Sequence, residues 1–246
     1  SNLFKKNFLN SLYIIFLGAI SSYSLPPYNY FIINFITFSL FFIFIFNKKK
    51  TPNNKHFFQY GWYFGFGYFL FSLYWISISL TFDQSFKFLI PVAVILLPAF
   101  LAIFYGLMTY LFSIFYSKNV IISFFIFSIL FGTIEFARGS ILTGFPWNLI
   151  SFSFSSSIYF IQILSIIGTY SFNLICISLF TLPALFILKN SRTEIVVCFF
   201  FILISVAFLI FGKITDNHFN SLESVKNSYT IKAISPNINL DRFYSK

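Results

Sequence analysis

The chain has 246 residues, of which 58% are hydrophobic and only 9% are charged. A soluble globular protein carries about 25% charged residues, so the composition excludes a soluble domain and predicts that lipid surrounds most of the chain. The formal net charge of +10 does not indicate a nucleic-acid-binding protein, because Lys and Arg fall mainly in short loops between apolar runs.

The apolar runs, taken in chain order, predict an all-α polytopic membrane protein with seven transmembrane helices. A helix needs about 20 apolar residues to cross the hydrocarbon core, and these runs meet or approach that length. The run at 158–188 exceeds a straight span, so we expect it to be tilted or to extend beyond the bilayer. The predicted helices lie at about 8–25, 28–46, 57–81, 88–116, 119–138, 158–188 and 194–212.

Proline and glycine residues indicate where the first helix ends and how another helix packs. Pro26-Pro27 is expected to close the first helix, because proline cannot continue the helical hydrogen-bond ladder. Gly61, Gly65 and Gly67 contain the small-residue spacing that lets two helices approach closely. We therefore expect these glycines to serve packing.

The distribution of basic residues predicts the orientation in the membrane. Loops on the side of the N-terminus hold nine Lys and Arg residues, against three on the other side. Basic residues favour the cytoplasmic side, so the N-terminus is expected to be cytoplasmic and the tail after residue 212 to lie outside. The nine are Lys5, Lys6, Lys48, Lys49, Lys50, Lys55, Lys118, Lys189 and Arg192, and the three are Lys87, Arg138 and Lys213.

The tail differs in composition from the rest of the chain. Residues 213–228 are polar and are expected to form a linker, whereas 229–234 alternate as in a short strand. Because one strand cannot fold alone, we expect 229–246 to be the start of a truncated extracytoplasmic α/β domain in a fragment.

The segment from Glu135 to Trp147 gathers charged and irregular residues at one end of an apolar run. Glu135 and Arg138 are three positions apart, so they share a helix face and can pair. One interpretation is an ion pair that reaches out to the membrane interface. The favoured interpretation is a polar patch facing a cavity that receives a lipid headgroup.

The residues after this pair predict a non-helical wall beside it. Gly144 permits unusual backbone angles, and Pro146 fixes its own. Phe145 and Trp147 suit the headgroup boundary, as does Trp75, for which an aromatic belt is a sufficient explanation. The candidate lipid-binding residues are Trp75, Glu135, Arg138, Gly144, Phe145, Pro146 and Trp147.

No catalytic, metal or cofactor site can be assigned from the sequence. It contains no phosphate-binding glycine loop, no metal-ligand cluster and no plausible Ser/His/Asp set. His56 and His218 are isolated, and Cys176 and Cys198 lie inside apolar runs as small packing residues.

The run Glu135-Phe-Ala-Arg-Gly-Ser-Ile-Leu-Thr-Gly-Phe-Pro-Trp147 closely resembles the signature segment of bacterial apolipoprotein N-acyltransferases. The similarity extends to Ser24-Leu-Pro-Pro-Tyr-Asn29, to 65–75, to 162–173 and to 231–238, the last of which resembles the strand that opens the family's nitrilase-like domain. Ser235 departs from the family, which usually has Gln there.

The resemblance implies an enzyme that moves an acyl chain from a phospholipid to the α-amino group of a lipoprotein's N-terminal diacylglyceryl-cysteine, the last step of lipoprotein maturation. Its implied partners are the phospholipid donor, the lipoprotein acceptor and membrane lipids, in the bacterial inner membrane with the tail in the periplasm. No cofactor is implied. The family's Glu-Lys-Cys set is expected beyond Lys246, so the fragment itself would be inactive. In the full-length enzyme, Arg138→Ala is expected to weaken acyl transfer without loss of expression.

Two other classes of protein are considered. A polytopic transporter often shows internal repeats and broken helices near the membrane midplane. Here no repeat is visible and the charged pair lies near one face. A non-catalytic membrane anchor for an extracytoplasmic partner is the third interpretation.

Overall fold

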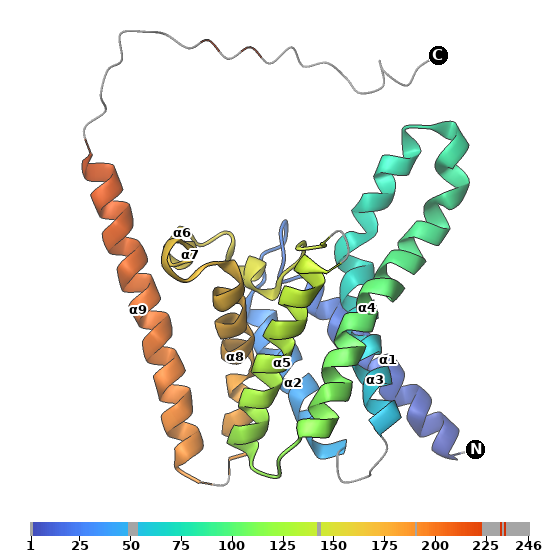
Figure 1. The fold of residues 1–246 in the computed structure, drawn as a ribbon, viewed down its shortest axis with the longest axis horizontal. Coiled ribbons are helices and arrows are strands. Elements are labelled where there is room, and N and C mark those ends of the chain that lie inside the picture. The colour runs from blue at the N-terminus through green and yellow to red at the C-terminus, as the bar shows by residue number, and fades with distance from the viewer. Residues whose placement is uncertain are drawn as a thin grey trace.

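The computed structural model describes residues 2–48, 54–141, 144–189 and 191–222, together with Lys232 and Ile234. Within these ranges all regular structure is helical, which confirms the all-α prediction, and the helices form a bundle between two ends (Figure 1). The α-helices are α1 Asn2–Ser22, α2 Ile32–Lys48, α3 Asn54–Leu73, α4 Ile90–Phe115, α5 Val120–Ser140, α6 Ile158–Ile161, α7 Leu164–Ile167, α8 Thr169–Ile187 and α9 Thr193–Ser221. The 3-10 helices are η1 Tyr74–Thr81, η2 Gln84–Leu89 and η3 Ile150–Phe154.

Five helical stretches of the described chain are long and apolar enough to cross a membrane. Two shorter apolar helices, Phe8–Ser22 and Ile32–Lys48, run between the same two ends of the bundle (Figure 1). Seven crossings therefore stay a prediction. The five stretches are His56–Thr81, Gln84–Phe115, Val120–Ser140, Thr169–Ile187 and Thr193–Ser221.

The predicted continuous helix over 158–188 is wrong, because the structure divides it into α6, α7 and α8. Gly168 ends α7 with a φ of +75°, a left-handed backbone angle that cannot continue a right-handed helix. Only α8 remains long enough to span, and α6 and α7 lie together at one end of the bundle (Figure 1). The tilted helix is therefore wrong, and the excess length forms the short helices α6 and α7. That this part extends beyond the bilayer stays a prediction.

The start of the chain also differs from its predicted boundaries. The first helix ends at Ser22, and α2 begins only at Ile32. Between them the chain turns, and the Tyr30 N–H donates to the Tyr23 carbonyl at 3.1 Å. The first helix ends four residues before Pro26, so Pro26-Pro27 lies within the turn and does not itself close the helix as predicted.

Helix α3 lies between α1 and α4 and packs most extensively against these two. A Cβ added to Gly61 would overlap the Tyr105 carbonyl of α4, and one added to Gly67 would overlap the Ile15 carbonyl of α1. The predicted packing role of these glycines is confirmed, because no larger residue leaves room for the neighbouring backbone.

Gly67→Ala is expected to destabilise the bundle by about 1–3 kcal/mol, because the added methyl group must push α1 away from α3. Gly106→Ala is the matched control, since its Cβ would meet the ring of Phe58, a side chain that can rotate, rather than backbone. Thermal unfolding of both variants in detergent checks this. Equal midpoints for the two variants would contradict it.

Basic residues gather at one end of the bundle. Lys48 closes α2, Lys118 precedes α5, and Lys189 and Arg192 flank the connection from α8 to α9, all at the end where the chain begins (Figure 1). The opposite end carries residues 23–31, the 3-10 helices η1 and η2, and 144–157. The predicted strand lies outside the described residues except for Lys232 and Ile234.

Candidate functional site

The segment after α5 is irregular, as predicted. Gly144 adopts a φ of +72° and its N–H donates to the Ile141 carbonyl at 3.0 Å, which turns the chain back along α5. The Phe145 N–H then donates to the Arg138 carbonyl at 3.0 Å. Asn148 also has a positive φ, +57°, an angle that Asn tolerates better than most residues. Thr143 lies outside the described residues.

Arg138 fastens this segment to α5. Its guanidinium pairs with Glu135 Oε1 at 3.0 Å and donates from Nη1 to the carbonyls of Phe145 and Trp147, both at 2.8 Å. The ring of Phe69 lies 5.2 Å from the Arg138 Cζ. One guanidinium therefore satisfies two loop carbonyls that have left the helical ladder.

Glu135 accepts the remaining hydrogen bonds of the cluster. Its Oε1 also accepts from the Tyr105 hydroxyl at 2.7 Å, and its Oε2 accepts from Asn173 Nδ2 at 2.8 Å and from the Ile150 N–H at 3.3 Å. Asn173 Oδ1 in turn accepts from the Ser151 N–H at 2.8 Å. The cluster thus ties α4, α5 and α8 to the segment that follows α5.

The Glu135–Arg138 pair is enclosed in protein. Glu135 is 0% exposed and Arg138 is 1% exposed, so the interpretation as a pair that reaches the interface does not hold. Neither residue lines the cavity described next. Within this structure, both charges are compensated by the protein and act as a scaffold behind the site.

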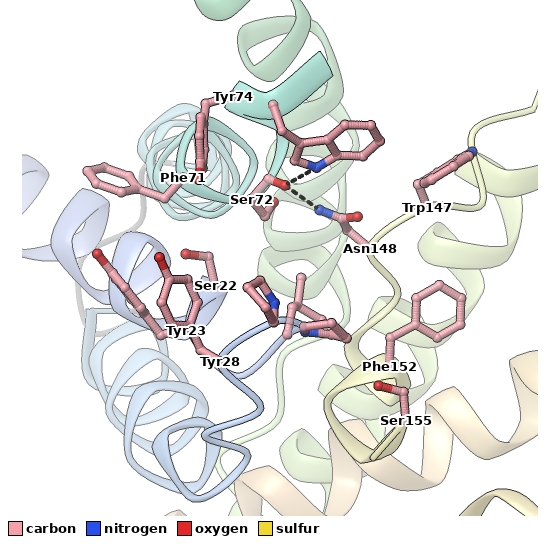
Figure 2. Close-up of a pocket in the computed structure, with 14 residues that line it drawn as sticks. Ser22, Tyr23, Tyr28, Phe71, Ser72, Tyr74, Trp147, Asn148, Phe152 and Ser155 are labelled. Carbon is pink, nitrogen blue, oxygen red and sulfur yellow. Dashed lines mark hydrogen bonds between the residues drawn. The ribbon is translucent and has the colours of Figure 1, made fainter. Parts of the chain in front are cut away.

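A cavity of about 460 Å³ lies at the end of the bundle opposite the basic residues, and Figure 2 shows the side chains that line it. Three segments far apart in sequence form it: the turn after α1, the junction of α3 and η1, and the chain from Trp147 to Ser155. Its lining combines aromatic rings and prolines with serine hydroxyls and one carboxamide. The lining residues are Ser22, Tyr23, Leu25, Pro26, Pro27, Tyr28, Phe71, Ser72, Tyr74, Trp75, Trp147, Asn148, Phe152 and Ser155.

Asn148 holds two walls of the cavity together. Its Nδ2 donates to the Ser72 carbonyl at 3.2 Å, and its own carbonyl accepts from the Tyr68 hydroxyl at 3.0 Å. Trp75 Nε1 donates to the same Ser72 carbonyl at 3.0 Å (Figure 2). The two walls are therefore joined by side-chain hydrogen bonds rather than by packing alone.

Two tryptophans stand at the edge of the cavity. The rings of Trp75 and Trp147 lie 5.6 Å apart between centroids, tilted by 47°. They are 42% and 54% exposed, although both are large apolar side chains. Exposed tryptophans at one end of a membrane bundle are typical of the headgroup region.

The structure separates the seven sequence-predicted site residues into three groups. Trp75 and Trp147 line the cavity, whereas Glu135 and Arg138 lie behind it. The rest do not line it. Gly144 forms the turn, Phe145 packs against the core and Pro146 is exposed.

Sequence reasoning missed Tyr68, Tyr105, Asn148 and Asn173. Asn173 carried a usable signal, because a carboxamide inside an apolar run must find partners. Asn148 carried a weaker one, as a polar residue next to the predicted wall. Tyr68 and Tyr105 were not distinguishable among 15 tyrosines.

No cluster of metal ligands is found among the described residues. No group of three or more His, Cys, Asp or Glu residues occurs among them. Cys176 is buried in the core and Cys198 is half-buried against it, both as free thiols. Their predicted packing role is confirmed.

The part of the chain that carries this geometry matches known proteins. Residues 17–182 match the family model described as "Apolipoprotein N-acyltransferase N-terminal domain". The apolipoprotein N-acyltransferase of Rhizobium etli (strain CIAT 652) is 36% identical over 188 residues, which cover 73% of this chain and 35% of the relative. That of Rhizobium leguminosarum bv. trifolii (strain WSM2304) is 35% identical over 187 residues, covering 72% and 34%.

A longer match is found with the apolipoprotein N-acyltransferase of Brucella melitensis biotype 1, which is 29% identical over 231 residues, 90% of this chain and 42% of the relative. The chain spans about a third of the length of the first two relatives. All three segments that form the cavity, and Asn173, fall within the residues that match the family model.

Proposed function

The chain belongs to the apolipoprotein N-acyltransferase family, and on that basis we propose that its cavity binds the lipid substrates of acyl transfer. The proposed reaction moves an acyl chain from a phospholipid to the α-amino group of the diacylglyceryl-cysteine at the N-terminus of a lipoprotein. The proposed setting is the bacterial inner membrane, with the N-terminus in the cytoplasm and the cavity on the periplasmic side.

The observation that carries this proposal is the meeting of three distant segments at one cavity. Each lies within the residues matched to the family, and each contributes both apolar and polar groups. The rings of Tyr23, Phe71 and Phe152 suit glyceryl and acyl groups. The second Asn148 amide N–H can donate to an ester carbonyl, and the Ser22 oxygen, which already donates to the Ala19 carbonyl, can accept from an amide N–H. A lipid has this same division between its polar and apolar parts.

The proposed role of the described residues is binding, not bond making. No Lys, Arg, His, Cys, Asp or Glu is among the residues that line the cavity. The serine hydroxyls of the lining would need an adjacent base to act as nucleophiles, and the lining supplies none of these groups as that base. Trp75 and Trp147 would contact the lipid, and Arg138 would act as a positioning residue that holds Trp147 in place.

Ser155→Trp is expected to weaken binding of a diacylglyceryl-cysteine peptide about tenfold, because the indole would fill the cavity. Ser79→Trp is the matched control, since Ser79 is an exposed residue of η1 outside the cavity. Binding of a fluorescent diacylglyceryl-cysteine peptide to the purified chain in detergent, followed by anisotropy, measures both. The proposal fails if the two variants bind the peptide as tightly as the unmodified chain.

A further inference from the structure

A second cavity, of about 430 Å³, lies between α1 and α3 at the end of the bundle where the chain begins. The α1 wall consists of Phe8, Ser11, Leu12 and Ile15. These positions are spaced so that they share one face of the helix. The cavity is therefore bounded on one side by a largely apolar stripe.

The other wall belongs to the first three turns of α3 and is mainly polar. His56, Gln59, Tyr60 and Tyr63 line it with the same helical spacing. This cavity shares no residue with the one proposed for the substrates.

The cavity exists because α1 and α3 touch in their later halves and separate toward their starts. A Cβ on Gly18 would overlap the Phe64 carbonyl, and one on Gly67 would overlap the Ile15 carbonyl. The start of α1 leans outward from the bundle (Figure 1). The separated halves form a wedge that opens toward the surrounding lipid, with Phe8 61% exposed.

The polar wall presents hydrogen-bond donors. His56 Nδ1 lies 3.1 Å from Gln59 Oε1. Because a carboxamide oxygen only accepts, His56 is the donor in this hydrogen bond, and the two N–H groups of the Gln59 amide are not used in it. Tyr60 and Tyr63 line the same cavity, and no hydrogen bond of either hydroxyl is found within the described part of the chain. These donors suit a phosphate group.

The sequence around the wedge is basic and carries no acidic residue. Lys5 and Lys6 precede Phe8 on α1, and Lys55 precedes His56 on α3. The first Asp or Glu of the chain is Asp83. A ligand with a net negative charge is therefore favoured at this end over a zwitterionic one.

The wedge continues along α1 as an apolar groove. A third cavity, of about 520 Å³, shares Leu12 and Ile15 with the wedge and is lined further along by Phe16 and Ala19. Only its far end, at Phe71, touches the lining of the substrate cavity. From Phe8 to Ala19 the helix rises about 16 Å at 1.5 Å per residue, which is about half the thickness of the hydrocarbon core. One acyl chain of one leaflet matches this length.

We propose that the wedge between α1 and α3 binds an anionic phospholipid from the leaflet at the basic end. Its phosphate lies against Gln59, Tyr60 and Tyr63, and one acyl chain follows α1 past Leu12 as far as Phe16. The lipid is a bound component of the bundle and not the acyl donor, because it lies at the end opposite the substrate cavity.

The test uses the purified full chain in detergent and native mass spectrometry with added phosphatidylglycerol or phosphatidylcholine of identical acyl chains. One tightly held phosphatidylglycerol is expected, bound about tenfold more tightly than phosphatidylcholine. Equal retention of the two lipids would overturn the proposal. Competition by millimolar inorganic phosphate as effective as that by the lipid would also overturn it, since the site would then bind free phosphate.

Two pairs of variants locate the lipid. Leu12→Trp fills the wedge and is expected to abolish the tight site. Its control, Leu96→Trp on the exposed face of α4, is expected to leave the tight site intact.

The double change His56→Ala and Gln59→Ala is expected to weaken phosphatidylglycerol binding about tenfold. Its control, His218→Ala, is exposed on α9 and is expected to leave phosphatidylglycerol binding unchanged. Unchanged lipid binding in both wedge variants would refute this location. Binding of the diacylglyceryl-cysteine peptide should be unaffected in every variant, which separates this proposal from the proposed function.

Discussion

Arg138→Ala is expected to lower the free energy of unfolding by about 3–5 kcal/mol, the usual loss when one partner of a buried ion pair is removed. The change leaves the Glu135 carboxylate buried without its cation. It also removes the donors to the Phe145 and Trp147 carbonyls. SDS titration of the purified chain, followed by circular dichroism, measures the loss.

Arg192→Ala is the matched control, because Arg192 is exposed at the start of α9 and its loss should change stability by less than about 0.5 kcal/mol. The double variant Glu135→Gln with Arg138→Met should be more stable than Arg138→Ala, since it buries no unpaired charge. The buried-pair account would be wrong if Arg138→Ala were as stable as Arg192→Ala.

The loss of stability expected for Arg138→Ala differs from the effect that the sequence predicts, which is weaker acyl transfer without loss of expression. An Arg138 that faced a lipid headgroup could be replaced with loss of acyl transfer alone. An Arg138 that is 1% exposed and bonded to two loop carbonyls is needed for the fold of the wall. Its replacement should therefore lower stability and lipid binding together, through the position of Trp147.

The helical class and the order of the elements were predictable, because apolar runs between basic loops leave the backbone no alternative in lipid. The division of 158–188 was harder to predict. Gly168 has a positive φ where α7 ends and α8 begins, and apolar residues predominate on both sides of it, so hydropathy does not mark the break. The two ends of α1 and α2 were misplaced for a related reason, since hydropathy continues into the turn at 23–31.

The candidate site was predictable in part. An ion pair between Glu135 and Arg138 follows from their spacing and is confirmed at 3.0 Å. Its burial does not follow, since that depends on Tyr105 and Asn173, which are 30 and 38 positions from Glu135 in sequence. The cavity could not be foreseen for the same reason. It requires the turn after α1 to meet Trp147, and no local pattern encodes that contact.

Asn173→Asp is expected to destabilise the chain by about 4 kcal/mol at pH 7, although the two side chains have nearly the same shape. The Nδ2 that donates to Glu135 Oε2 at 2.8 Å becomes an oxygen, so the buried Asp must carry a proton to avoid facing a second carboxylate. The ordinary pKa of Asp is about 3.9, which is about three pH units below pH 7. Each unit corresponds to about 1.36 kcal/mol, so protonating the Asp at pH 7 costs about 4 kcal/mol.

The sign of the pH dependence distinguishes this cause from a general loss of packing. The proton is easier to supply as pH falls, so the deficit of Asn173→Asp should shrink to about half between pH 7 and pH 5.5. Asn173→Leu is the matched control, because it loses the same two hydrogen bonds without adding a charge, and its deficit of about 2 kcal/mol should not change with pH. SDS titrations of both variants at the two pH values give the comparison. A deficit of Asn173→Asp that stays constant or grows as pH falls would show that Glu135 is not the acceptor at this position.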